Sequence, residues 1–139
     1  MPYEFLPHTA EIKIRSSAES FPRALEELAS AIADFLTRGN AKKLPEKNLE
    51  KIKEISFEKN DLNALTYNFI EEILFELDAN EMVVLRAKVS ELKGKMKVEF
   101  YGLPARKFRA LEYIKSPTYS EMRVIEKDGK ATIEVVLDV

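Results

Sequence analysis

The stretch TYSEMRVIEKDGKATIEVVLDV, residues 118–139, is the part of the chain that says most about its fold. Asp128-Gly129 is typical of a two-residue type I′ turn, in which both central residues have positive φ. Apolar and polar residues alternate on both sides of this turn, as they do in antiparallel strands with one buried face. The stretch therefore predicts a C-terminal β-hairpin in which Lys127 pairs with Lys130.

Counting away from the turn predicts the register of this hairpin. Val124 is expected opposite Ile133, and the further expected pairs are Met122–Val135, Ser120–Leu137, Tyr119–Asp138 and Thr118–Val139. The apolar residues of the two strands then face one another. The same register puts the Asp138 side chain on the face opposite Leu137, one residue before the carboxylate of Val139. We expect these two carboxylates to lie beside residues 115–120.

Hydrophobic periodicity predicts the remaining elements. Apolar residues at helical spacing predict one helix that begins after the N-cap Ser20 and ends before Gly39, and another that begins near Asn60 or Asp61. Alternation predicts strands around residues 12–14, 83–89 and 96–100, and a further strand is expected near 49–57. Each strand has one apolar face that the helices can cover. We expect an α+β fold in which antiparallel sheets are covered by two amphipathic helices, a single-domain sandwich over residues 1–139.

Composition excludes several classes of function. The chain contains no cysteine, which excludes disulfides, thiolate nucleophiles and cysteine-ligated metals. Its 22 Lys and Arg residues against 24 Asp and Glu residues give a net charge of −2, so no general attraction to nucleic-acid phosphates is expected. Neither a secretory leader nor a membrane-length apolar stretch is evident. We expect a cytoplasmic protein that binds neither membranes nor DNA.

Few residues can support catalysis. His8 is the only histidine and no nucleophile motif accompanies it, so a Ser-His-Asp triad and a two-imidazole zinc site are disfavoured. We therefore expect that the protein is not itself an enzyme. The carboxylates of Asp138 and Val139 can bind a hard divalent cation if a third acidic group joins them, or they can simply be solvated.

Two charged groups in the middle of the chain have alternative interpretations. A basic run can contact phosphates or an acidic protein surface, and it can equally be a solvated face; its members are Arg106, Lys107, Arg109 and Lys115. The second predicted helix carries acidic residues that we expect on its solvated face, without a chemical role: Glu71, Glu72, Glu76 and Asp78.

Residues 3–12, YEFLPHTAEI, resemble the opening of the archease family, whose pattern is close to Tyr-x-x-x-x-His-Thr-Ala-Asp-Ile. Three later segments resemble the family in the same order: residues 75–78 (FELD), 114–119 (IKSPTY) and 137–139 (LDV). The resemblance therefore covers the whole chain. Two residues depart from the pattern, since Glu11 stands where aspartate is usual and Ser120 where histidine is common after Thr-Tyr.

The resemblance implies a function in RNA processing. Archeases are activators of the RtcB-type tRNA-splicing RNA ligase, and they promote its GTP-dependent guanylylation and its multiple turnover. The family's divalent-metal site, with calcium expected, corresponds here to Glu11, Asp138 and Val139. The resemblance also implies a role in activation or partner contact for a further set of residues: His8, Lys115, Thr118 and Tyr119.

Two other functions remain open at this point. An RNA-binding adaptor for a tRNA-modifying enzyme would use the basic run at residues 106–115 and would bind tRNA directly. A small metal-dependent hydrolase would use the same carboxylates and would act without a partner. An activator of the ligase would instead meet tRNA only indirectly, through its partner.

Overall fold

The structure, a computed structural model, describes residues 3–4 and 10–139 of the chain. Residues 10–139 form six strands and two α-helices, with three short 3₁₀ turns between them. In chain order these elements are β1 (Glu11–Ala18), α1 (Phe21–Leu36), η1 (Asn40–Lys43), η2 (Glu46–Asn48), β2 (Glu50–Glu58), α2 (Leu62–Asn80), β3 (Met82–Leu92), β4 (Lys95–Pro104), η3 (Ala105–Lys107), β5 (Ser116–Lys127) and β6 (Lys130–Asp138).

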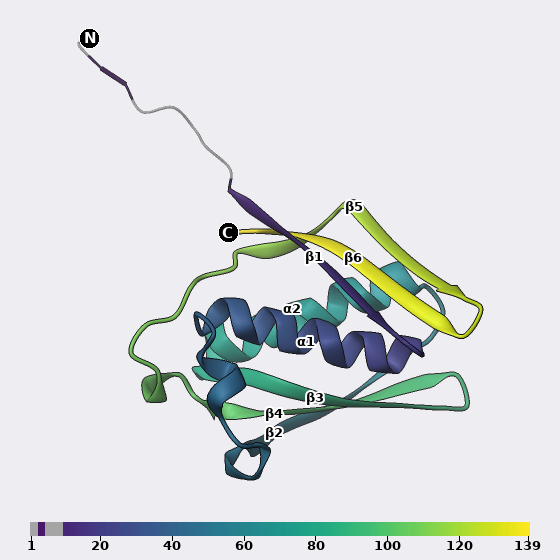
Figure 1. Ribbon diagram of the computed structural model, residues 1–139, viewed down its shortest axis with the longest axis horizontal. Helices are drawn as coiled ribbons and strands as arrows, with labels where there is room; N and C mark the ends of the chain where they lie inside the picture. Colours follow the sequence, from purple (N-terminus) through teal and green to yellow (C-terminus); the bar gives the residue numbers. More distant parts are fainter. Residues whose placement is uncertain (1–2, 5–9) are drawn as a thin grey trace.

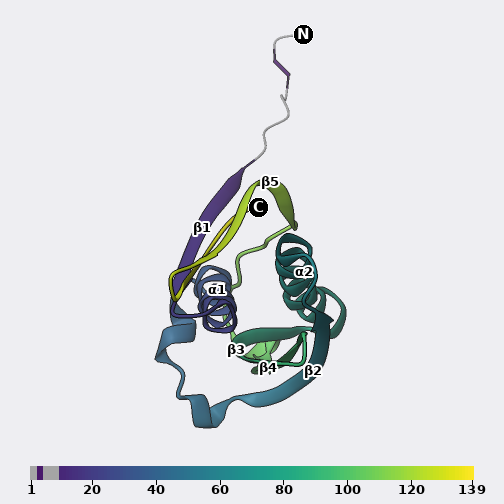
Figure 2. The same cartoon turned by 90° about the vertical axis from the view of Figure 1, so that its right-hand side faces the viewer.

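The strands form two antiparallel three-stranded sheets with both helices between them (Figures 1 and 2). Sheet A has the strand order β1-β6-β5, and sheet B has the order β2-β4-β3. This arrangement confirms the predicted α+β fold of antiparallel sheets covered by two helices. Each helix contacts both sheets, so its apolar stripe is covered from two sides.

The helices begin where the sequence predicts. The Ser20 hydroxyl accepts a hydrogen bond from the amide of Arg23 at 3.3 Å, and the Asp61 carboxylate accepts from the amides of Asn63 and Ala64 at 3.0 and 3.1 Å. These side chains satisfy amides that have no partner within the helix. The Ser20 N-cap is therefore confirmed, and of the two residues expected at the start of the second helix it is Asp61 that caps it.

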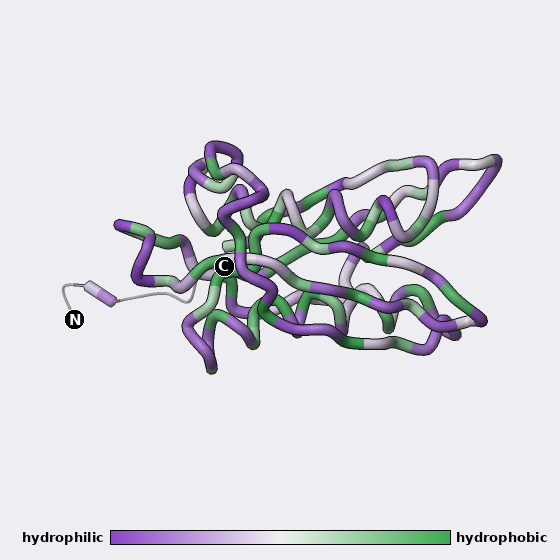
Figure 3. The backbone as a smooth tube through the Cα atoms, turned by 90° about the horizontal axis from the view of Figure 1, so that it is seen from below, coloured by the Kyte–Doolittle hydropathy of each residue, from purple (hydrophilic) through white to green (hydrophobic). Residues whose placement is uncertain are grey.

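The core fills the space between the sheets. The rings of Phe69 on α2 and Phe100 on β4 meet edge to face, with their centroids 5.6 Å apart. Both rings are fully buried, as are Leu25, Leu28 and Ile133. Hydrophobic and hydrophilic residues alternate along the strands (Figure 3), so each sheet turns one face to the helices.

The C-terminal hairpin confirms one half of the predicted register and corrects the other. Asp128 and Gly129 both have positive φ, Lys127 pairs with Lys130, and Val124 lies opposite Ile133. Beyond Arg123 the predicted pairs are wrong, because Thr118 pairs with Val136. Residues 119–122 stand between these pairs on β5, whereas Val135 alone does so on β6. This β-bulge brings Ser116, rather than Tyr119, opposite Asp138.

No helix among the described residues is long and apolar enough to cross a membrane.

Candidate functional site at the end of sheet A

Two acidic side chains meet at one end of sheet A. Glu11 begins β1 and lies directly opposite Asp138, the last residue of β6. Residues directly opposite in an antiparallel pair carry their side chains on the same face, here the face turned away from the helices. The amide of Val139 donates to the carbonyl of Ala10 at 3.0 Å, which continues the pairing past Asp138. The structure therefore brings Glu11, Asp138 and Val139 together.

The third strand of the sheet holds Asp138 from its other side. Ser116 of β5 lies opposite Asp138, and the amide of Lys115 donates to the Asp138 carbonyl at 2.8 Å. Because β6 is the central strand, the Asp138 backbone is fixed between β1 and β5. Ser116 was not predicted as a site residue, because its position depends on the bulge in β5, and no motif in the sequence predicts that bulge.

The donor atoms at this end suit a hard cation. Asp138 and Val139 are half-buried, while Glu11 and Lys115 are exposed. Two side-chain carboxylates and a carboxylate at Val139 form an all-oxygen set, which calcium and magnesium prefer. In residues 3–4 and 10–139 no group of three or more His, Cys, Asp or Glu side chains is arranged to hold a metal. Glu11 and Asp138 thus supply two side-chain carboxylates to this end of the sheet, and a metal site there stays a prediction.

The other residues implicated by the family pattern lie at different distances from this end. Thr118 follows on β5, where its hydroxyl donates to the carbonyl of Val136 at 3.2 Å. Tyr119 lies in the bulge and stacks on Tyr67 of α2, with ring centroids 4.4 Å apart and planes 7° from parallel. His8 lies outside the described residues. Thr118 and Tyr119 are thus supporting neighbours of the acidic end and do not border Asp138.

The carboxylates of α2 are not all solvated, contrary to prediction. Glu76 is only 3% exposed, and its carboxylate accepts from Lys53 Nζ at 3.1 Å and from Asn80 Nδ2 at 3.2 Å. Lys53 also donates to Glu72 at 2.7 Å. The prediction was wrong because Lys53 of β2, a strand distant in sequence, contacts this carboxylate in the folded chain. The polar groups of this cluster therefore find their hydrogen-bond partners within it, which indicates a structural role.

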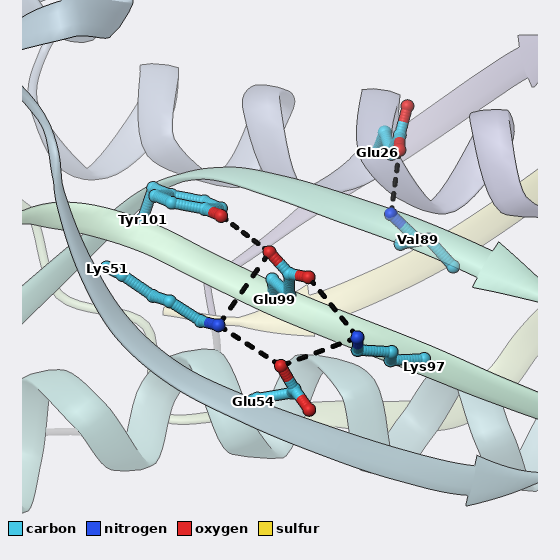
Figure 4. Close-up of polar contacts among 7 residues, drawn as sticks. All are labelled: Glu26, Lys51, Glu54, Val89, Lys97, Glu99 and Tyr101. Carbon is cyan, nitrogen blue, oxygen red and sulfur yellow. Dashed lines mark hydrogen bonds and ion pairs between the residues drawn. The ribbon is translucent and has the colours of Figure 1, made fainter.

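The outer face of sheet B carries a second polar cluster (Figure 4). Lys51 and Lys97 each contact both Glu54 and Glu99, at distances of 3.1 to 4.0 Å. The hydroxyl of Tyr101 donates to Glu99 at 2.5 Å, and this hydrogen bond, with the two lysines, lowers the pKa of the Glu99 carboxyl below its usual range. Every charge in the cluster has an opposite partner, which leaves none free for a ligand.

Side chains of α1 also bind the backbone of β3, one of the two edge strands of sheet B. Glu26 of α1 accepts from the amide of Val89 at 2.8 Å, and Arg23 donates to the Val89 carbonyl at 2.6 Å (Figure 4 draws the first of these bonds). Arg23 and Glu26 also pair with each other at 2.6 Å. Together they take the place that a neighbouring strand would occupy on β3, a known way of protecting an exposed strand edge.

The fold and the acidic strand end define a class of small α+β proteins in which two antiparallel sheets enclose two helices. The sequence model of the Archease protein family matches residues 3–139. The chain therefore belongs to the archease family. This finding confirms the resemblance drawn from the sequence motifs.

Curated relatives and solved structures agree with this assignment. The chain is 33% identical to the archease of Pyrococcus abyssi, over 99% of this chain and 98% of that protein. It is 31% identical to the archease of Sulfolobus acidocaldarius, over the same shares of the two chains. An archease structure from Thermotoga maritima, described as a possible chaperone, covers 99% of this chain and 97% of its own, with a TM-score of 0.66 and 18% identity. At that identity the last likeness concerns the fold alone.

Proposed function

We propose that this protein activates the RtcB-type tRNA-splicing RNA ligase by presenting the acidic end of sheet A to the ligase active site. The observation that carries the proposal is the pairing of Glu11 with Asp138 beside Val139, at a strand end fixed from both sides. Membership of the archease family supports the same function. In this scheme the ligase carries out the covalent transfer of GMP, and the archease positions charge around it.

The residues at this end have distinct roles in the proposal. The carboxylates of Glu11, Asp138 and Val139 bind a divalent cation, with calcium expected from the oxygen ligands. When bound, such a cation supplies positive charge that stabilises negatively charged phosphate oxygens. Lys115 is exposed and is attached beside Asp138 through its own amide, so its ammonium group can reach a nucleotide phosphate of the ligase.

The side chain of Glu11 is one methylene longer than that of the aspartate that is usual in the family. Its position opposite Asp138 keeps the carboxylate on the same face of the sheet. Because Glu11 is exposed at the beginning of an outer strand, the longer side chain has room to adjust without disturbing the core. We therefore expect Glu11→Asp to retain cation binding, and Glu11→Gln to weaken it.

The test compares stimulation of the ligase by three forms of the protein. GTP-dependent guanylylation and multiple-turnover RNA joining are measured with wild type, Asp138→Asn and Asp128→Asn. Asp128 is exposed at the turn of the same hairpin, and asparagine is well suited to a type I′ turn, which makes this a matched control. We expect stimulation by wild type and by Asp128→Asn, and its loss in Asp138→Asn with an unchanged melting temperature.

A C-terminal extension and calorimetry test the ligand set. One alanine added after Val139 displaces the main-chain carboxylate, so we expect loss of both stimulation and calcium binding. Isothermal titration with calcium and with magnesium, for wild type and for Asp138→Asn, measures cation binding directly. Full stimulation by the extended protein would contradict the proposed role of the Val139 carboxylate, and absence of stimulation by wild type would contradict the activator function.

A further inference from the structure

A basic loop joins the two sheets at the same end of the molecule as the acidic site. It comprises residues 105–115, which connect β4 of sheet B with β5 of sheet A. Figure 1 shows the loop running from η3, beside sheet B, to the start of β5 next to the C terminus. The loop carries four positive side chains, Arg106, Lys107, Arg109 and Lys115, against a single acidic one, Glu112.

The backbone of this loop is held in place. The amide of Glu112 donates to the carbonyl of Leu36 at the end of α1, at 2.8 Å, and the Ile114 side chain is buried in the core. Lys115 is joined to Asp138 by the hydrogen bond described above. The backbone of the loop is therefore anchored near its end, which lowers the entropic cost of ordering it on a ligand.

The positive charges of the loop are free. Arg106, Lys107, Arg109 and Lys115 are all exposed, and within the described part of the chain none of the four forms an ion pair. The single carboxylate of the loop, Glu112, is bound by Arg38 at 2.7 Å. Exposed cations that form no ion pair attract phosphate groups.

We propose that residues 106–115 contact the phosphates of single-stranded RNA close to the RNA end that the ligase joins. This inference rests on the proposed function, because it places RNA beside the acidic site, and it departs from the expectation that an activator meets tRNA only indirectly. The side chain of Tyr113 is 55% exposed among the cations, and an exposed aromatic ring next to positive charge is the combination that binds unpaired bases. The ring favours RNA over an acidic protein surface, which would need only the charges.

The test separates guanylylation, which needs no RNA, from joining, which does. The triple variant Arg106→Gln, Lys107→Gln, Arg109→Gln removes three charges of the loop. Its matched control, Lys43→Gln, Lys127→Gln, Lys130→Gln, removes three exposed lysines that lie elsewhere and form no ion pair in residues 10–139. Both variants have the same net charge, so a difference between them reports position alone.

We expect both variants to stimulate guanylylation as wild type does. In RNA joining by the ligase with each variant, the loop variant should raise KM for RNA about tenfold at 150 mM salt, with kcat kept, because phosphate contacts are lost. The control should match wild type. Equal KM values for the two variants would overturn the inference, and so would reduced guanylylation with the loop variant alone, since the loop would then contact the ligase itself.

A second measurement keeps the inference testable if wild type fails to stimulate the ligase. The probe is a fluorescein-labelled single-stranded RNA of twelve nucleotides, titrated with the protein alone at 50 mM salt. Wild type and the control should bind, with the logarithm of affinity falling linearly with the logarithm of salt concentration. The loop variant should bind more weakly and with a shallower slope, by about 2 for three lost phosphate contacts on a single strand. Equal RNA affinity of the loop variant and the control would refute the proposed contact between the loop and RNA.

Discussion

The two sheets carry acidic residues in opposite situations. On the outer face of sheet B, Glu54 and Glu99 are each contacted by two lysines, at distances of 3.1 to 4.0 Å. At the end of sheet A, Glu11 and Asp138 lie opposite each other, and neither forms an ion pair within the described residues. Like charges directly opposite one another destabilise a sheet. The comparison teaches that charges on the outer face of sheet B are paired and stabilise it, whereas Glu11 and Asp138 stand apart from the ion pairs found elsewhere in sheet A, such as Arg15 with Glu134.

The largest effect on stability is expected in sheet B, at Gly102. A Cβ atom at this residue would lie 1.8 Å from the Val83 carbonyl oxygen of the neighbouring strand. Since the Val83 carbonyl belongs to the main chain of a paired strand and cannot easily move aside, Gly102→Ala should lower the free energy of unfolding by about 3 kcal/mol or more. Urea denaturation measures the change. Ser56→Ala, on the exposed face of β2, is the control, and a Gly102→Ala protein as stable as this control would refute the predicted clash.

The second effect concerns the buried carboxylate of α2. Glu76→Ala removes one of two acids around Lys53 and leaves a small cavity, so we expect a loss of about 2 kcal/mol. The Lys53 side chain is 28% exposed and keeps Glu72, which places the loss below that of a fully buried pair. Glu72→Ala should cost less, since its side chain is 34% exposed. The two variants are compared by thermal and urea unfolding. An equal loss of stability in both would contradict the view that the buried Glu76 contributes more than the half-buried Glu72.

The third effect concerns the protected edge of β3. Glu26→Ala leaves the Val89 amide without its acceptor and exposes the strand edge, so we expect a loss of about 1 kcal/mol together with self-association at high concentration. Sedimentation velocity of the variant measures the association. Glu27→Ala is the matched control, because Glu27 is the next residue on α1 and is exposed. A strictly monomeric Glu26→Ala protein would show that the contact of Glu26 with Val89 is not what prevents pairing at the edge of β3.

The smallest effect is a pH dependence of sheet B. The hydrogen bond from Tyr101, with Lys51 and Lys97, lowers the pKa of the Glu99 carboxyl below its usual 4.5. A lowered native pKa means that Glu99 stabilises the fold fully above pH 4.5 and that this contribution is lost as pH falls through the native pKa. Tyr101→Phe should reduce the loss of stability between pH 6 and pH 3. Tyr113→Phe, at an exposed loop residue, should leave the pH profile of unfolding unchanged.

Local chemistry was sufficient to predict the elements. Ser20 was identified as an N-cap, the second helix start was placed at Asn60 or Asp61, and Asp128-Gly129 was identified as a type I′ turn, because each acts through atoms within three residues of itself. The alternation of apolar residues predicted which strand faces meet the helices, since that period is a property of the strand alone. The family motifs added Glu11 and Lys115, which periodicity does not single out.

The tertiary structure was needed wherever two distant segments meet. The bulge at residues 119–122 shifts the register beside Asp138, and it accompanies the stacking of Tyr119 on Tyr67 of another element. Glu76 is buried and pairs with Lys53 of β2, a strand distant in sequence. No local pattern encodes either contact, because both depend on the arrangement of elements around the shared core. The sequence thus determines the strands, helices, caps and turn of this archease, and long-range packing determines which of its charges are brought next to an opposite charge.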